Sequence, residues 1–127
     1  VGVTEHPEIS CMTIVVKGDE SVVGQVKNQL LKLTDVLKVD DLAYHESITR
    51  ELVLMIVNSK DSTRQEIISI CDVFKAKIVD MADEALMVEF SGSARQVNAI
   101  IQMLKKFGIK EMARTGQIAL PYQTTEW

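Results

Sequence analysis

Residues 86–92 read Leu-Met-Val-Glu-Phe-Ser-Gly, and this stretch decides how the rest of the chain is interpreted. Apolar Leu86, Val88 and Phe90 alternate with the side chains between them, a period of two that predicts a half-buried strand. Residues 12–18 form a second strand-like run, Met-Thr-Ile-Val-Val-Lys-Gly, which also ends on a glycine. The same pattern therefore occurs twice in the chain.

Both runs lead into an amphipathic helix, which we expect to begin near Gln25 in the first copy and near Gln96 in the second. Gly18 and Gly92 precede these helices. The free N–H groups of a helix start can hold an anion, but a lone glycine after a strand more often only permits the turn. We therefore assign these glycines to turns.

The second copy is complete because a further strand and helix precede it. An almost unbroken apolar run at 50–57 predicts a strand buried on both faces. A capping-box spacing, present as Ser62 with Gln65 and as Thr63 with Glu66, predicts that a helix starts there.

Four more elements complete this unit. They are a strand at 77–81, a strand at 85–91, a helix that opens with a Ser93 and Gln96 capping box and ends at Gly108, and a strand at 109–113. The order strand, helix, strand, strand, helix, strand is a split βαβ unit with both helices on one face of an antiparallel four-stranded sheet. The sequence therefore predicts the α+β class and a ferredoxin-like βαββαβ domain.

The first copy contains only part of this pattern. We expect strands at 1–4 and 10–16 around a turn at 5–8, then the helix, then a strand at 36–41. A single helix on three strands, roughly 45 residues in all, is at the lower limit of what folds unaided. We therefore expect two domains, an incomplete one at 1–45 and a complete one at 46–127, and the first must pack on another surface.

Composition limits the possible functions. The chain has 127 residues, of which 46% are hydrophobic and 25% charged, and a formal net charge of −4. This charge argues against binding to nucleic acid or to an acidic membrane surface. No apolar stretch is long enough to span a membrane and 1–10 lacks the features of a secretory signal, so we expect a cytoplasmic protein.

Catalytic and metal-binding groups are few. Cys11, Cys71, His6 and His45 are too few and too widely spaced for a familiar metal site, so we expect no cofactor on this chain. Both histidines lie in an expected turn or linker and make poor candidates for a catalytic base.

Three sets of residues, namely an acidic cluster, three lysines and the six methionines, are explained by structure better than by a functional site. The acidic cluster of Asp80, Asp83 and Glu84 could suggest paired catalytic carboxylates, but such residues at a hairpin mostly aid solubility. The spacing of Lys27, Lys32 and Lys38 fits a solvated helix face better than an anion site, and the six methionines fall mostly within strands and helices as packing residues.

Four stretches resemble, in the same order, the regulatory (small) subunit of acetolactate synthase, also called acetohydroxyacid synthase. They are Gln-Leu-Leu-Lys-Leu-Thr-Asp-Val-Leu-Lys-Val at 29–39, Arg-Glu-Leu-Val-Leu at 50–54, Phe-Lys-Ala-Lys-Ile-Val-Asp at 74–80 and Ala-Arg-Thr-Gly at 113–116. The resemblance implies tandem ferredoxin-like domains, the first an incomplete ACT domain.

The resemblance also implies a function. Such subunits carry no active site and associate with a catalytic subunit that uses thiamine diphosphate, magnesium and FAD. That partner condenses two pyruvates, or pyruvate with 2-oxobutyrate, in branched-chain amino-acid synthesis of valine, leucine and isoleucine. Binding of the small subunit raises its activity and confers feedback inhibition by valine.

In this family valine binds between two ACT domains of a dimer. The resemblance leaves the family's first ACT strand, its glycine-containing loop and its first helix without a counterpart here, and it points to Gly2 and Gln25 as the remaining effector-binding candidates. Alternatively, Gly2 is only a small residue near a chain end and Gln25 only an exposed helix residue. Pro121-Tyr122 departs from the basic residue and glycine that often follow in the family.

Three functional hypotheses remain at this point. A regulatory binding module fits the tandem layout, and unpaired strand edges in the first domain predict a homodimer. An RNA-binding module on the same layout needs paired aromatic residues on its central strands and a basic sheet face, whereas this chain is acidic. A small stand-alone enzyme would have to turn over pyruvate by itself, which we do not expect.

Overall fold

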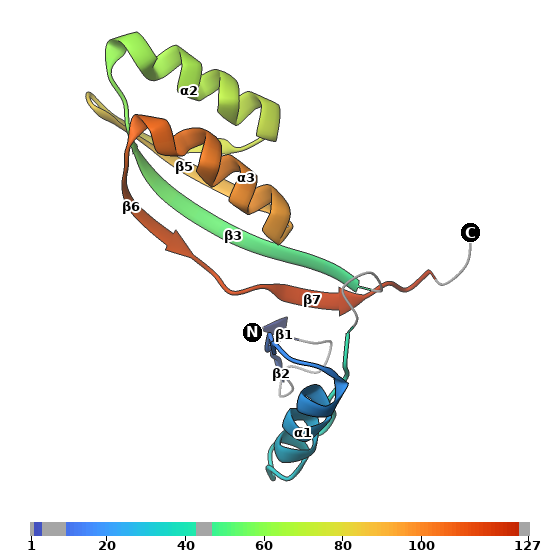
Figure 1. Ribbon diagram of the computed structural model, residues 1–127. Coiled ribbons are helices and arrows are strands. Elements are labelled where there is room, and N and C mark those ends of the chain that lie inside the picture. Colours follow the sequence, from blue (N-terminus) through green and yellow to red (C-terminus); the bar gives the residue numbers. More distant parts are fainter. Residues whose placement is uncertain (1, 4–9, 43–46, 125–127) are drawn as a thin grey trace. The chain divides into compact units, whose positions relative to one another are not determined.

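The computed structural model describes residues 2–3, 10–42 and 47–124. Contacts divide the chain into two compact units, one of Val1–Ile48 with Ile118–Trp127 and one of Thr49–Gln117. The predicted domain boundary between 45 and 46 lies outside the described residues. Figure 1 labels the elements of both units.

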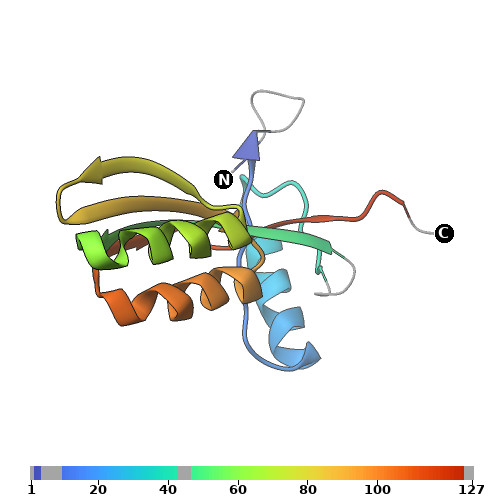
Figure 2. The ribbon, with the colours of Figure 1, turned by 90° about the horizontal axis from the view of Figure 1, so that it is seen from above.

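The second unit has the predicted order of elements. They are β3 (Ser47–Asn58, whose first two residues belong to the first unit), α2 (Asp61–Phe74), β4 (Lys77–Ala82), β5 (Ala85–Gly92), α3 (Ala94–Leu104), a 3₁₀ turn (Lys105–Phe107) and β6 (Ile109–Arg114). The strands lie in the order β4-β5-β3-β6 and neighbours run antiparallel. Both helices lie on one face of this sheet (Figures 1 and 2). The α+β class and the ferredoxin-like arrangement are confirmed.

The core lies between this sheet and its two helices. On the sheet side, Val53, Met55 and Val57 of β3 stand opposite Phe90, Val88 and Leu86 of β5, and all six are buried. The helices contribute buried Ile67 and Cys71 from α2 and buried Val97, Ile100 and Leu104 from α3. These residues recur every three or four positions on each helix, as expected for a helix with one buried face.

The N-termini of α3 and α2 show which of the predicted capping boxes form in the structure. At α3, Ser93 Oγ accepts a hydrogen bond from the Gln96 N–H at 3.3 Å, and Gln96 Oε1 accepts one from the Ser93 N–H at 3.0 Å, so the predicted capping box forms. At α2 neither predicted box forms. The N-cap is Lys60, two residues before Ser62, and the extended Lys60 donates its N–H to Thr63 Oγ1 at 3.1 Å.

The first unit is less regular than predicted. β1 (Gly2–Val3) pairs antiparallel with β2 (Ser10–Cys11), so the second strand ends well before residue 16. α1 (Glu20–Leu31) begins earlier than expected because Asp19 caps it: Asp19 Oδ1 accepts from the Val22 N–H at 3.1 Å.

The predicted strand at 36–41 does not form. The chain turns after α1, where the Val36 N–H donates to the Leu33 carbonyl at 3.1 Å, and then continues without regular structure. An alternating sequence becomes a strand only when a neighbouring strand accepts its hydrogen bonds. None of the described strands pairs with this segment.

A short strand that the sequence pattern did not predict lies near the end of the described residues. β7 (Ile118–Pro121) pairs with the long strand β3. The Ala119 N–H also donates to Thr13 Oγ1 at 3.2 Å. The C-terminal segment therefore belongs to the first compact unit, although it follows the second in sequence.

Candidate functional site

The two effector-binding candidates lie on different elements of the first unit. Gly2 lies in β1 opposite Cys11 of β2. Gln25 lies in the middle of α1 and is exposed. These positions fit an effector site and also fit the alternatives, a small residue near a chain end for Gly2 and an exposed helix residue for Gln25. The effector-binding role of both residues therefore stays a prediction.

Gln25 lines a shallow depression of about 730 Å³ on α1 and the turn that follows it. Its other lining residues are Val26, Gln29, Leu30 and Leu33. The surface therefore combines two amides with three apolar side chains and carries no charge. Sequence reasoning named Gln25 but missed Gln29, whose i,i+4 spacing places it next to Gln25 on the helix.

The apolar side of α1 is not buried. No residue of α1 is buried, and the helix leaves Val22 and Leu31 among the exposed large apolar residues. On the preceding segment, Met12 is 66% exposed and Val15 61% exposed. This unit therefore presents apolar surface of the kind that ordinarily packs against another surface.

The acidic cluster is part of a hairpin. Arg64 of α2 donates from Nη2 to the carbonyls of Ala82 and Asp83, at 2.6 and 2.9 Å, and from Nε to Ser59 Oγ at 2.9 Å. The buried Ser59 donates its N–H to the Glu84 carbonyl at 2.8 Å. Backbone carbonyls rather than carboxylates make these contacts, which favours the structural interpretation of the cluster.

The lysine positions do not form an anion site in the structure. Lys32 is the C-cap residue directly after α1, and exposed Lys38 pairs with Asp40 at 3.5 Å. Lys27 is half-buried in the middle of α1. Three lysines with separate surroundings fit the interpretation of a solvated surface.

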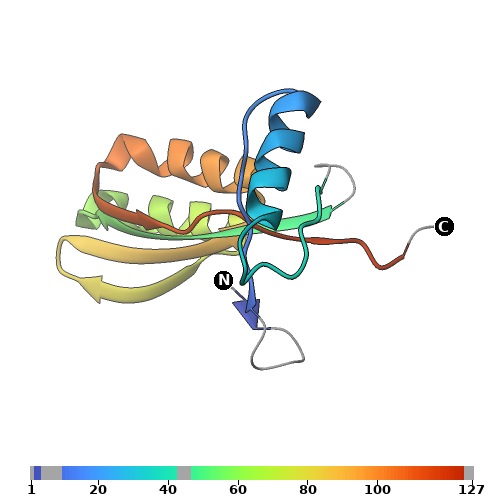
Figure 3. The ribbon, with the colours of Figure 1, turned by 90° about the horizontal axis from the view of Figure 1, so that it is seen from below.

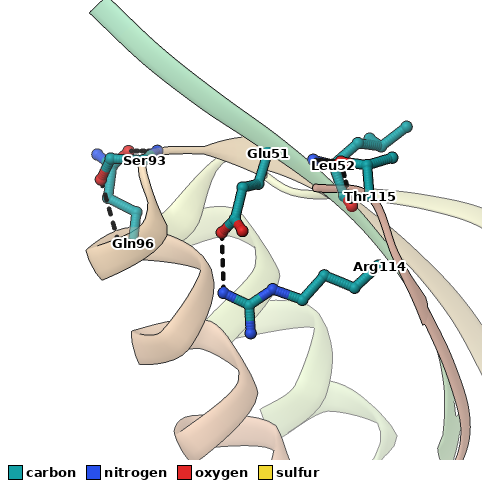
Figure 4. A network of polar contacts seen from close by, with 6 residues as sticks. All are labelled: Glu51, Leu52, Ser93, Gln96, Arg114 and Thr115. Atoms are coloured by element: carbon teal, nitrogen blue, oxygen red, sulfur yellow. Dashed lines mark hydrogen bonds and ion pairs between the residues drawn. The ribbon is translucent and has the colours of Figure 1, made fainter. Parts of the chain in front are cut away.

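The second unit contains a polar pair at the end of its sheet, shown in Figure 4. Arg114 Nη2 donates to Glu51 Oε2 at 2.8 Å, and only 10% of the Glu51 side chain is exposed. Beside it, Thr115 Oγ1 accepts from the Leu52 N–H at 2.9 Å, and the Thr115 N–H donates to the Leu52 carbonyl at 2.9 Å. These bonds join the end of β6 to β3, and their effect is structural.

The structure offers little support for the rival functions. Phe90, the aromatic residue of β5, is buried and packs edge-on against Phe74, with ring centroids 6.0 Å apart. It is therefore not available to stack on an RNA base. His6 and His45, the candidate bases, lie outside the described residues.

The described residues contain neither a metal-binding cluster nor a membrane-spanning helix. No group of three or more His, Cys, Asp or Glu side chains there could hold a metal ion. None of the described helices is long and apolar enough to cross a membrane. Cys11 is exposed and Cys71 buried, and burial, together with the charge of Asp72, raises the pKa of the Cys71 thiol.

Comparison with known proteins gives a consistent result along the chain. Residues 50–123 match the family described as the small subunit of acetolactate synthase, and residues 1–38 match the AHAS small subunit-like ACT domain. A curated relative from Archaeoglobus fulgidus, named "Probable acetolactate synthase small subunit", is 42% identical over 120 residues, which cover 94% of this chain and 75% of the relative.

Two further comparisons agree. The acetolactate synthase small subunit of Aquifex aeolicus is 45% identical over 94% of this chain and 63% of its own length. The crystal structure of the acetolactate synthase small subunit from Thermotoga maritima is similar with a TM-score of 0.78 and 32% identity, covering 86% of this chain and 68% of that one.

Proposed function

Because the chain belongs to the acetolactate synthase small-subunit family, we propose that it is a non-catalytic regulatory subunit that binds and activates an acetolactate synthase catalytic subunit. The match over residues 1–38 and 50–123 carries this proposal. Thiamine diphosphate, magnesium and FAD belong to the catalytic partner, whose product enters the synthesis of valine, leucine and isoleucine. This chain contributes binding surfaces and no catalytic group.

The first unit acts in this proposal as the part that pairs with a second copy. Its support is the exposed apolar surface of that unit, which includes Met12, Val15 and Leu31. Burying apolar area contributes about 25 cal/mol per Å², so surface of this kind favours association. The homodimer is the state in which that surface leaves water.

Valine is the proposed effector, held between two chains near Gly2 and Gln25. A ligand that contacts both copies favours one mutual arrangement over another, and this preference couples effector binding to catalysis in the partner. The amides of Gln25 and Gln29 are suitable polar contacts on an otherwise apolar surface.

Size-exclusion chromatography with light scattering tests the association directly. The full chain, mixed with a purified catalytic subunit, should elute as a complex whose mass exceeds that of either protein. If the two proteins elute separately at every ratio, the proposed regulatory role is wrong. The chain alone should elute as a dimer, and a monomer would contradict that part of the proposal.

The effector site requires its own variant. Gln25→Ala should weaken the response of the complex to valine severalfold without preventing association with the catalytic subunit. Gln102→Ala, on the exposed side of α3, is the matched control and should leave the response unchanged. An unchanged response in Gln25→Ala would remove Gln25 from the site.

A further inference from the structure

The chain passes between its two compact units twice. It first passes from the first unit to the second within β3, between Ile48 and Thr49, and it returns between Gln117 and Ile118. β6 and β7 both pair with β3, and they lie one after the other along it in Figures 1 and 3. We call residues 115–121, which run from the end of β6 through β7, the C-terminal strap.

Thr115 holds the start of this strap with its side chain. Its N–H donates to the Leu52 carbonyl at 2.9 Å, which continues the ladder between β6 and β3. The Leu52 N–H donates at 2.9 Å to Thr115 Oγ1 rather than to a backbone carbonyl, and this hydroxyl donates to the Leu52 carbonyl at 3.3 Å. Both backbone groups of Leu52 therefore depend on one threonine, directly after the last residue of β6 (Figure 4).

Beyond Thr115, exposed side chains and a few hydrogen bonds characterise the strap. Ile118 is 55% exposed and Leu120 is 64% exposed. The Ala119 N–H donates to Thr13 Oγ1 at 3.2 Å, a part-buried contact within the first unit. Segments with few buried apolar contacts open locally at a low free energy. We therefore expect the strap to open more readily than the sheet of the second unit.

The helix and short strands of the first unit depend on such contacts. No residue of α1 is buried, and β1 and β2 are each two residues long. Where little apolar surface is buried, a single hydrogen bond makes up a large share of the stability. By contrast, the buried core residues of the second unit lie between Val53 and Leu104 and include no residue of the strap.

We propose that the C-terminal strap is a conformational switch that opens and closes together with α1, and that the Thr115 hydroxyl holds it closed. The closed strap ties Ala119 to Thr13 and so stabilises the first unit. Opening loosens the first unit and leaves the core of the second unit intact. The coupling is reciprocal, so a change that stabilises α1 also favours the closed strap. This inference goes beyond the proposed regulatory function, because it concerns a single chain without valine or the catalytic subunit.

Amide hydrogen exchange of the full chain, followed residue by residue by NMR, tests the proposal. Thr115→Val keeps the branched shape of the side chain but lacks the hydroxyl that bonds Leu52. Exchange should become about tenfold faster at residues 118–120 and in α1, because the open state is more populated. Exchange at residues 86–90 of β5 should stay unchanged, since the core of the second unit does not include the strap.

A conservative variant separates the hydroxyl from the rest of the threonine side chain. Thr115→Ser keeps the hydroxyl and loses only the methyl group. Its exchange rates at residues 118–120 and in α1 should match those of the unaltered chain.

A change in α1 tests the coupling in the opposite direction. Gly24→Ala should stabilise α1, because glycine weakens a helix interior and no atom lies within 4 Å of the added Cβ. It should slow exchange at residues 118–120 about threefold. Asn98→Ala, at an exposed position of α3, is the matched control: it raises helix propensity in the second unit and should leave exchange at residues 118–120 unchanged.

Three kinds of outcome would overturn the proposal. Unchanged exchange at residues 118–120 in Thr115→Val, or an equal acceleration in Thr115→Ser, would mean that the hydroxyl does not hold the strap. Faster exchange of the strap without a change in α1, or no slowing in Gly24→Ala, would mean that the two open independently. An equal acceleration at residues 86–90 would mean that Thr115 stabilises the whole chain. The catalytic subunit takes part in none of these measurements, so this proposal and the proposed function fail independently.

Discussion

Arg114 at the end of β6 donates from Nη2 to Glu51 Oε2 of β3 at 2.8 Å, although the two residues are 63 positions apart in the sequence. The Glu51 carboxylate is nearly buried, with 10% of its side chain exposed, while 31% of the arginine remains exposed. A carboxylate in this position depends on its partner, because little water reaches it. The pair therefore fixes the end of the sheet of the second unit.

Replacing the arginine should destabilise the chain more than replacing both residues. Arg114→Leu leaves the Glu51 carboxylate nearly buried and unpaired, and should lower the free energy of unfolding by about 2 kcal/mol. The double variant Glu51→Leu with Arg114→Leu removes the unpaired charge and should be less destabilised than the sum of the two single changes. Urea denaturation measures all four proteins, and strictly additive effects would contradict the coupling.

Arg64 should hold the hairpin between β4 and β5. Arg64→Ala removes three hydrogen bonds, to Ser59, Ala82 and Asp83, and should cost about 1–3 kcal/mol of stability. Hydrogen exchange should become faster at residues 82–85, because their anchor to α2 is lost. Arg95→Ala, at an exposed position of α3, is the control and should leave exchange in the hairpin unchanged.

Gly108 should not tolerate a side chain. Its φ is +94°, and an added Cβ would lie 2.5 Å from Asn58 Nδ2. Gly108→Ala should therefore lower the melting temperature, at a cost of about 1–3 kcal/mol. Gly116→Ala provides the comparison, because no atom lies within 4 Å of its added Cβ. Equal melting temperatures for the two variants would show that the backbone at Gly108 is not constrained.

The two cysteines should react very differently. The buried Cys71 thiol has a pKa raised above its usual value of 9.0, so it carries little thiolate near neutral pH. A thiol reagent at pH 8 should modify exposed Cys11 quickly and Cys71 only after unfolding. Rapid modification of both cysteines in the folded chain would contradict the burial of Cys71.

The raised pKa of Cys71 also predicts how the free energy of unfolding depends on pH. Above pH 9.0 the unfolded chain loses the thiol proton before the folded chain does, so the folded state binds more protons. The contribution of Cys71 to the free energy of unfolding should therefore fall as pH rises above that value. Cys71→Ala lacks this group, and its stability should fall less between pH 8 and about 10.

The second unit could be predicted well because its signals are local. The alternation at 86–92 and the capping box at Ser93 are both present in the structure. Both reflect interactions within a few residues, which a sequence shows directly. The start of α2 was predicted less well: the predicted N-cap, Ser62 or Thr63, lies two or three residues after the observed N-cap, Lys60.

The first unit could not be predicted as well, since its elements depend on distant partners. Residues 36–41 alternate like a strand, but none of the described strands pairs with them. β7 was missed because it forms against β3, which begins about seventy residues earlier in the sequence. For the candidate site, Gly2 and Gln25 followed from the family resemblance alone, and the polar pair of Glu51 and Arg114 had no sequence signal before the strands were placed.

The rate of acetolactate formation from pyruvate tests the central claim most directly. A purified catalytic subunit, with its thiamine diphosphate, magnesium and FAD, is titrated with the full chain at a fixed pyruvate concentration. We predict a saturable rise in rate, with no turnover by the chain alone. A rate that stays constant up to a large excess of the chain, or turnover by the chain itself, would contradict its role as a regulatory subunit.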